Sequence, residues 1–211
     1  MIELYYRPGA ASMPVHSLLE EVGADYRLRK VTGRGDSLEP PELLRLNPHG
    51  WVPALVDGEL VLTESVACLL HLSDRFPEAD LAPGLGTPER ARWYRWLVYM
   101  TNTVQPAFLV YFYPDRYAPE GDAADAVGAT ASRRLAGMRD YLEGELAAHG
   151  PYLLGERFTS ADLFLHALTR WGRRLEPSWW TLPHLGAHYR LVDERPAVRR
   201  MREQEELDDS T

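Results

Sequence analysis

The sequence has few of the residues on which several protein classes depend. Cys68 is the only cysteine among 211 residues, which excludes an internal disulfide and any CxxC redox or zinc pattern. Lys30 is the only lysine, and the formal net charge of −8 disfavours nucleic acid and anionic membranes as partners. No apolar run approaches the roughly 20 residues that span a bilayer. The seven histidines show no HExxH spacing, so we expect no bound metal.

The overall composition is that of a folded protein. Hydrophobic residues make up 45% of the chain and charged residues 26%, which is ordinary globular usage. A chain of 211 residues allows one large domain or two small ones, with enough material for a packed core. The first residues, MIELYYRPG, are too polar for a signal peptide. We therefore expect a soluble cytoplasmic protein.

The first third of the chain alternates strand and helix patterns. A strand is predicted at 2–6, a helix with Ser12 at its N-cap position and Gly23 at its end, and a second strand at 26–31. This order predicts a βαβ unit with a parallel strand pair. A loop at 33–36 and a short helix that begins at Pro40-Pro41 and reaches Leu46 follow.

The stretch 47–72, NPHGWVPALVDGELVLTESVACLLHL, carries the strongest local signal. Asp57-Gly58 between two short apolar runs predicts a hairpin with strands at 54–56 and 60–62. A helix with one buried face is predicted at 64–75. Because the first backbone N–H groups of a helix have no partner inside it, a helix that opens at Glu64-Ser65 predicts a site for a small anionic ligand.

The remainder of the chain reads as helical. A stretch at 78–87 with two glycines and a proline is the predicted linker. A long aromatic-rich helix is predicted at 88–112, with a kink at Pro106, and a second long helix at 123–149. The expected fold is therefore α/β plus all-α, with domains at 1–77 and 88–211.

Two further features close the sequence. Thr159 and Asp162 have the spacing of a capping box, which explains Asp162 without a catalytic role. Short helices are predicted at 183–192 and 196–203. The last residues, EQEELDDST, are expected to form a frayed acidic tail.

Taken together, these segments resemble the glutathione transferase superfamily over essentially the whole chain. The specific marks are NPHGWVPAL at 47–55, LTESVACLLHL at 62–72 and GERFTSADLFL at 155–165, in the order and spacing of that family. The opening YYRPGAASMPVHSLLEEVG most resembles its bacterial beta-like branch. The resemblance implies a thioredoxin-like βαβ-ββα domain, a C-terminal helical bundle, glutathione as cosubstrate, a small electrophilic substrate and a homodimer.

The resemblance also implies roles for individual residues. The Val52–Pro53 bond is expected to be cis, and the Val52 backbone to pair with the cysteinyl part of glutathione. Glu64 and Ser65 match the pair that holds the γ-glutamyl end, with Glu64 attracting the ammonium group. The full set of implied glutathione-binding residues is His49, Trp51, Val52, Pro53, Glu64 and Ser65.

Each of these residues also has a plain structural explanation. Pro53 could be a strand-entry proline, Ser65 an ordinary N-cap, and Glu64 a favourable charge in a first helical turn. The register of the three family-like segments favours ligand binding over these alternatives.

Catalysis depends on a different part of the sequence. A free thiol has a pKa of about 8.5, so the glutathione thiol needs help to ionise near neutral pH. The beta-like branch has a cysteine where this chain has Ala11, and a His-Lys pair where our alignment places Gln105-Pro106. Ser12 is the first candidate donor to the thiolate, with helix capping as its alternative, and Tyr6 is the second.

The function predicted from the sequence is a glutathione transferase that activates the thiol for conjugation to a small electrophile. Three alternatives stay open at this point. One is a non-catalytic glutathione-binding or structural relative that acts as a regulator or interaction module. The others are a related glutathione-dependent isomerase and a glutathione-dependent peroxidase.

Overall fold

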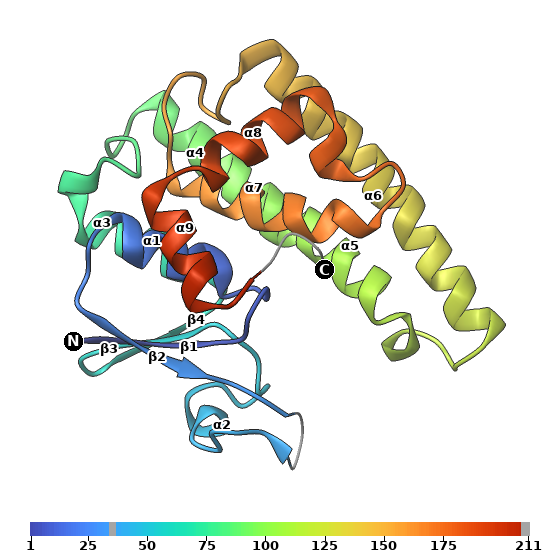
Figure 1. Ribbon diagram of the computed structural model, residues 1–211, viewed down its shortest axis with the longest axis horizontal. Helices are drawn as coiled ribbons and strands as arrows, with labels where there is room; N and C mark the ends of the chain where they lie inside the picture. Colours follow the sequence, from blue (N-terminus) through green and yellow to red (C-terminus); the bar gives the residue numbers. More distant parts are fainter. Residues whose placement is uncertain (34–36, 208–211) are drawn as a thin grey trace. The chain divides into compact units, whose positions relative to one another are not determined.

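The computed structural model describes residues 1–33 and 37–207 (Figure 1). By internal packing the chain forms two compact units, one of residues 1–82 with the C-terminal residues from Val192 onward, and one of residues 83–191. The division after Ala82 lies inside the predicted linker at 78–87. Most of the predicted loop at 33–36, and the last part of the predicted tail, 208–211, lie outside the described residues.

A four-stranded mixed sheet with the strand order β2-β1-β3-β4 forms the base of the first unit. β1 pairs in parallel with β2 and antiparallel with β3, and β3 pairs antiparallel with β4. The predicted hairpin is confirmed, and Gly58 in its turn has φ +62°, a conformation that favours glycine. The strands are β1 (Ile2–Tyr6), β2 (Tyr26–Lys30), β3 (Ala54–Asp57) and β4 (Leu60–Thr63).

Three helices lie on one side of this sheet and one short helix on the other (Figure 1). The three are α1 (Met13–Glu21), α3 (Ser65–Arg75) and α9 (Pro196–Gln204). α1 contacts both α3 and α9, and its first seven residues are all buried. A helix that is buried on every side needs packing partners all round it. The sheet and α3 cover two sides of α1, and α9 covers a third.

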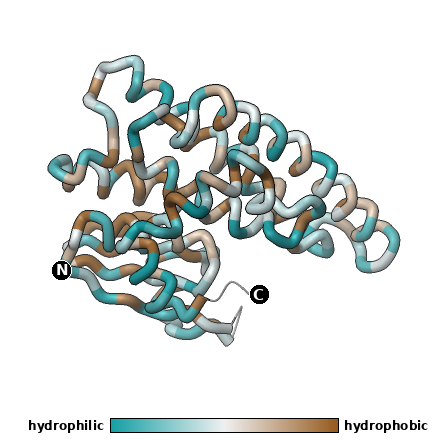
Figure 2. The backbone as a smooth tube through the Cα atoms, turned by 45° about the horizontal axis from the view of Figure 1, so that its top comes forward, coloured by the Kyte–Doolittle hydropathy of each residue, from teal (hydrophilic) through white to brown (hydrophobic). Residues whose placement is uncertain are grey.

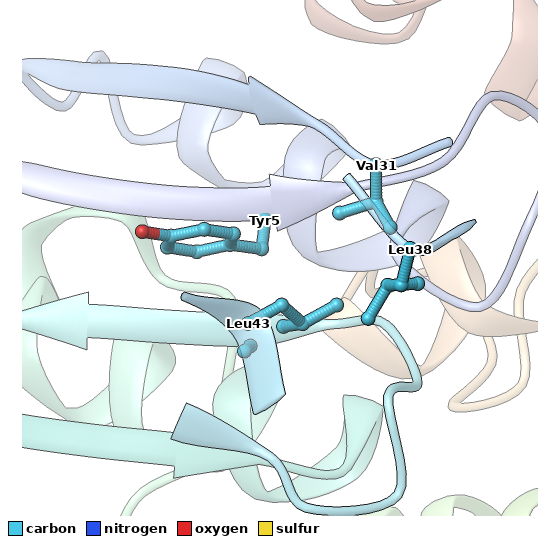
Figure 3. Packing of buried hydrophobic residues seen from close by; sticks show 5 residues of the cluster. Tyr5, Val31, Leu38 and Leu43 are labelled. Atoms are coloured by element: carbon cyan, nitrogen blue, oxygen red, sulfur yellow. The ribbon is translucent and has the colours of Figure 1, made fainter. Parts of the chain in front are cut away.

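The short helix α2 (Leu43–Leu46) packs against the opposite face of the sheet. Side chains alternate along a strand, so Tyr5 lies on this face while its neighbours Leu4 and Tyr6 lie on the other. Figure 3 shows Tyr5 together with Val31 and Leu38, which follow β2, and Leu43 of α2. The buried cluster consists of Tyr5, Val31, Leu38, Leu43 and Ala54.

The second unit consists of helices. The predicted interruption near Pro106 is confirmed as a π-helical turn, Met100–Val104, between α4 (Pro88–Tyr99) and α5 (Gln105–Phe112). A proline has no N–H for the preceding turn and its ring crowds the carbonyl there, so a wider turn before Pro106 relieves both problems. The other helices are α6 (Asp122–His149), α7 (Ser160–Trp171) and α8 (Pro183–Asp193).

α7 forms the centre of this unit, because all twelve of its residues are buried. The predicted cap at its start is confirmed, since the Asp162 carboxylate accepts the Thr159 amide N–H at 2.8 Å. The same carboxylate accepts the Leu153 amide N–H at 2.9 Å. In Figure 2, hydrophobic and hydrophilic segments alternate along the surface helices, as expected of helices with one buried face.

The C-terminal residues differ from the predicted frayed tail. Glu205 is 1% exposed, and Gln204 and Glu205 make hydrogen bonds to residues of α1, β2 and the loop after β1. The prediction was wrong for residues 203–207. A run of acidic residues resembles a solvated tail in sequence. Here, however, the Glu205 carboxylate bonds to the buried imidazole of His16 and to the backbone amide of Gly9.

Candidate functional site

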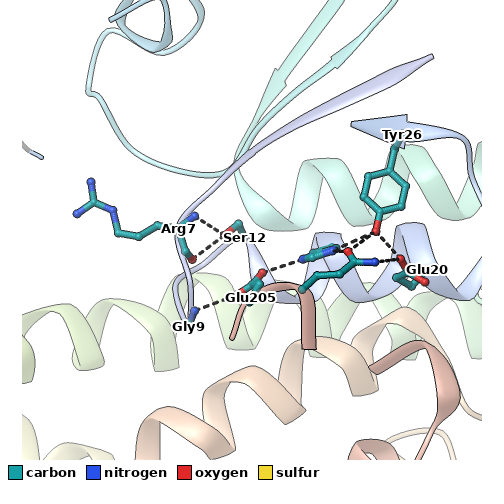
Figure 4. A network of polar contacts seen from close by, with 8 residues as sticks. Arg7, Gly9, Ser12, Glu20, Tyr26 and Glu205 are labelled. Carbon is teal, nitrogen blue, oxygen red and sulfur yellow. Dashed lines mark hydrogen bonds and ion pairs between the residues drawn. The ribbon is translucent and has the colours of Figure 1, made fainter. Parts of the chain in front are cut away.

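The loop between β1 and α1 is closed on itself by Ser12. The Ser12 hydroxyl accepts the Arg7 amide N–H and donates to the Arg7 carbonyl, both at 3.2 Å, and the side chain is fully buried (Figure 4). Ser12 stands at the N-cap position of α1, but its side chain makes no capping bond. The interpretation of Ser12 as a side-chain cap is therefore wrong. Its hydroxyl closes the loop instead.

The same loop presents backbone donors at the start of α1. Ala10 and Met13 donate their N–H groups to the carbonyls of Arg7 and Ala10, at 3.1 and 3.0 Å. Within the described residues, the N–H groups of Ala11 and Ser12 donate no hydrogen bond. Unpaired N–H groups at the positive end of a helix dipole attract a negatively charged atom.

Tyr6 lies at the end of β1, next to this loop. Its side chain is buried, and its ring lies 5.8 Å from the ring of His16 between centroids. Burial raises the pKa of Tyr6, and the negative charges of Glu205 and Glu206 raise it further. The phenol therefore stays protonated at neutral pH and can act as a hydrogen-bond donor.

The start of α3 is joined directly to the loop before α1. The Ser65 hydroxyl, which is buried, donates to the Ala11 carbonyl at 2.7 Å. Two helix N-termini of the first unit are therefore adjacent. A ligand with two negatively charged groups, or one charged and one ionisable group, can meet the first backbone N–H groups of a helix at both places.

Glu64 has an unusual backbone conformation at this junction. Its φ is +70° and its ψ is 120°, although it carries a side chain. Such a conformation costs about 1–3 kcal/mol and persists where the surroundings determine it, often at a ligand site. Its exposed carboxylate has no hydrogen-bond or ion-pair partner among the residues that the structure describes.

The loop before β3 is organised by a residue that the sequence analysis did not single out. Asn47 is buried, donates from Nδ2 to the Trp51 carbonyl at 2.8 Å and accepts the His49 amide N–H through Oδ1 at 3.2 Å. An asparagine before Pro48 is a typical turn-former, and this was the signal that could have identified it.

The loop before β3 also carries exposed side chains and the backbone of Val52. Trp51 is 58% exposed and its ring lies 5.6 Å from that of His49, which is also exposed. The bond between Val52 and Pro53 is cis. Across residues 1–33 and 37–207, no hydrogen bond is formed by the backbone N–H or C=O of Val52. The six predicted glutathione-binding residues thus lie in two segments of the first unit.

The remaining candidates for catalytic chemistry are unsuited to it. Cys68 is fully buried in α3, and burial raises the pKa of its thiol to about 12. At the π-helical turn, Gln105 accepts the Thr101 hydroxyl at 3.3 Å through Oε1, and Pro106 offers no polar side chain. Neither position supplies a positive charge.

Two other kinds of feature are absent from the described part of the chain. No group of three or more His, Cys, Asp or Glu side chains there is placed to hold a metal ion. No helix among those residues has the length and apolar content needed to cross a membrane.

Comparison with known proteins matches the chain to one family over most of its length. Residues 2–74 match the family described as glutathione S-transferase, N-terminal domain, and residues 99–196 match the glutathione S-transferase, C-terminal domain. Among curated proteins, the glutathione S-transferase GstA of Escherichia coli O157:H7 is 32% identical over 200 residues, which cover 94% of this chain and 96% of that protein.

Solved structures give the same result. A glutathione transferase from Methylococcus capsulatus superposes with a TM-score of 0.87 at 34% identity, covering 99% of this chain and 100% of the other. A beta-class glutathione S-transferase from Sphingomonas chungbukensis gives a TM-score of 0.86 at 32% identity, with 98% and 100% coverage. The predicted fold, a thioredoxin-like unit with a helical unit, is confirmed. The chain belongs to the glutathione S-transferase family and is a glutathione transferase.

Proposed function

We propose that this transferase binds glutathione along the loops of its first unit and ionises the thiol for attack on a small electrophile. The observation that carries the proposal is the 2.7 Å hydrogen bond from Ser65 to the Ala11 carbonyl. It brings the start of α3 next to the start of α1, so one tripeptide can reach both. The γ-glutamyl carboxylate would lie at α3 and the cysteinyl sulfur at α1.

The γ-glutamyl end is assigned to Glu64 and Ser65. The Ser65 hydroxyl proton is directed to the Ala11 carbonyl, so its backbone N–H is the donor left for the carboxylate of glutathione. The exposed carboxylate of Glu64 would attract the ammonium group, and the strained backbone of Glu64 is consistent with a residue held for binding.

The cysteinyl and glycyl parts are assigned to the loop before β3. The N–H and C=O of Val52, which bond to no other described residue, could bond to the cysteinyl backbone like an added strand, with Pro53 next to it. The exposed rings of His49 and Trp51 would lie beside the glycyl end. Both rings have N–H groups that can donate to its carboxylate.

Thiol activation is assigned to the loop before α1. The N–H groups of Ala11 and Ser12 would stabilise the thiolate, with Ser12 and Tyr6 as the candidate catalytic side chains. The Ser12 hydroxyl could donate to sulfur only by releasing the Arg7 carbonyl, which costs about 1 kcal/mol. The thiol proton leaves to solvent, the thiolate forms a bond to the electrophilic carbon, and the leaving group departs with the electron pair of its bond.

We also propose a cytoplasmic homodimer. Reduced glutathione, which the reaction consumes, is the thiol of the reducing cytosol. Each unit exposes apolar side chains of the kind that a subunit interface covers, with Val98 56% exposed on α4 of the second unit and Leu60 41% exposed on β4 of the first. Light scattering coupled to size exclusion would give twice the chain mass of 24.0 kDa for the dimer.

Two measurements on the purified protein test the function. Retention on immobilised glutathione tests binding, and turnover of a chloronitrobenzene acceptor with glutathione tests activation. We expect both. Absence of binding at millimolar glutathione would overturn the proposal, and binding without turnover would identify a non-catalytic relative.

A further inference from the structure

One buried carboxylate connects the C-terminal residues to the loop between β1 and α1. Glu205 accepts the Gly9 amide N–H through Oε2 at 2.9 Å and contacts His16 Nδ1 through Oε1, also at 2.9 Å (Figure 4). The side chains of Glu205 and His16 are both fully buried. Gly9 lies midway along the loop that ends at Ala11 and Ser12, and its φ of +69° favours glycine.

The other ring nitrogen of His16 is also satisfied by the C-terminal residues. His16 Nε2 lies 2.7 Å from Gln204 Oε1, and the Gln204 amide is oriented because its Nε2 donates to Glu20 at 2.9 Å. Both ring nitrogens therefore face oxygen acceptors. The ring of His16 is therefore held from both sides, by Glu205 at Nδ1 and by Gln204 at Nε2.

Packing of α9 determines where Glu205 lies. Val198 and Met201 are fully buried in α9, and Arg195 forms a two-pronged ion pair with Glu21 of α1 at 2.6 and 2.8 Å. Arg200 pairs with Glu20 at 2.5 Å. The helix is thus fixed along α1, and the residue that follows it by one position reaches Gly9.

We propose that Glu205 is a positioning residue for the glutathione thiol, acting through Gly9. The inference rests on the proposed function. The Ser12–Arg7 hydrogen bonds close the two ends of the loop, and Glu205 holds its middle, so the N–H groups of Ala11 and Ser12 keep one direction. Without Glu205 the Gly9 amide and His16 Nδ1 each lose this partner, and the loop can change shape.

Glu205 acts through the length of its side chain rather than through its charge. A second negative charge beside a thiolate opposes its formation, so the carboxylate itself gives no electrostatic help. A glutamine has the same length, can accept the Gly9 N–H through its oxygen and can donate to a neutral His16 through its nitrogen. An aspartate keeps the charge but is one methylene shorter and cannot span both partners.

The first test compares Glu205→Ala with Glu206→Ala. Glu206 is the adjacent carboxylate, is exposed and pairs only with Lys30 in the described structure, so it is the matched control. Glu205→Ala should lower kcat about tenfold or more, as expected when a reacting atom is misplaced. It should also move the ionisation seen in the pH–rate profile to higher pH, while KM for glutathione changes little. Glu206→Ala should leave kcat, the ionisation in the pH–rate profile and KM for glutathione unchanged.

The second test remains decisive even if Glu205→Ala does not fold. Glu205→Gln should retain most of the wild-type kcat, and Glu205→Asp should retain less. Equal rates in the two variants, or a higher rate for Glu205→Asp, would overturn the proposal in favour of a charge effect. A wild-type rate and pH profile in Glu205→Ala would overturn it as well.

These outcomes separate the two proposals. If the wild-type protein turns over and Glu205→Ala behaves like it, the positioning role fails alone. If the wild-type protein neither binds nor turns over glutathione, the proposed function fails and this inference fails with it.

Discussion

The two helix starts of the first unit use their serines differently. At α1, Ser12 is fully buried and both its hydrogen bonds go to Arg7 of the same loop. At α3, Ser65 bonds across to the Ala11 carbonyl, 54 residues away in sequence. The first serine shapes its own loop, whereas the second joins two loops.

This difference bears on function. Within the part of the chain that the structure describes, the hydrogen bonds of the α1 start are satisfied internally, apart from the N–H groups of Ala11 and Ser12, and the loop depends on Glu205 for its position. The α3 start carries Glu64, which has a strained backbone and a carboxylate without a hydrogen-bond or ion-pair partner among the described residues. We therefore expect changes at α1 to affect mainly turnover and changes at α3 to affect mainly glutathione affinity.

Ser12→Ala should have the largest effect. The Arg7 amide loses its partner in a partly buried setting, so the free energy of unfolding should fall by about 1 kcal/mol. Turnover should fall at least about tenfold because the loop loses its closure. Denaturant unfolding measures the change in stability, and steady-state kinetics measure the change in turnover. The control is Ser17→Ala, which replaces a buried serine further along α1. An unchanged kcat would show that the loop does not need Ser12.

Ser65→Ala should have the next largest effect, with the opposite kinetic pattern. The Ala11 carbonyl loses its side-chain donor, which should cost about 1 kcal/mol of stability. Glutathione affinity should fall about tenfold, because the α3 N-terminus is no longer tied to α1. Calorimetric titration measures the affinity, with Ser73→Ala in the same helix as control. A larger effect on kcat than on affinity would contradict the comparison.

Glu64→Gly tests the strain at α3 and should have a smaller effect on stability. Glycine tolerates φ near +70°, so relief of strain should offset its greater freedom in the unfolded chain and leave stability equal or about 1 kcal/mol higher. Glutathione affinity should fall because the ammonium group loses its counter-ion. A clear loss of thermal stability would show that the conformation is not strained.

Cys68→Ala, one turn into α3, should have the smallest effect on the free energy of unfolding at neutral pH. The pKa of the Cys68 thiol is raised to about 12 in the folded state, whereas an unfolded thiol ionises near 8.5. The stabilising contribution is thus complete below about pH 8.5 and lost as pH rises towards 12. Between pH 8 and 9.5 the wild type should lose about 1 kcal/mol more than Cys68→Ala. If the wild type and Cys68→Ala lost the same stability as pH rises, the result would show that α3 leaves the thiol accessible.

Local patterns were sufficient to predict most of the first unit. Each strand forms within one residue of its predicted ends, because apolar alternation and the Asp57-Gly58 turn depend on neighbouring residues. The break before Pro106 and the cap at Asp162 were predictable for the same reason. Family-like segments located the residues at 49–53 and 64–65.

Long-range partners were not predictable. Ser12 has the sequence signature of a cap, but its hydroxyl bonds to Arg7 because the loop folds back on itself. Glu205 looks like one of several tail acids, and only the docking of α9 on α1 distinguishes it. Hydrogen bonds that span nearly the whole chain leave no local pattern.

The most direct test of the account is the pKa of the glutathione thiol bound to the wild-type protein, measured by following thiolate absorbance against pH. The proposed binding mode predicts a value clearly below the roughly 8.5 of a free thiol, because it places the sulfur at the N–H groups of Ala11 and Ser12 at the start of α1. A bound thiol that titrates like free glutathione would contradict it.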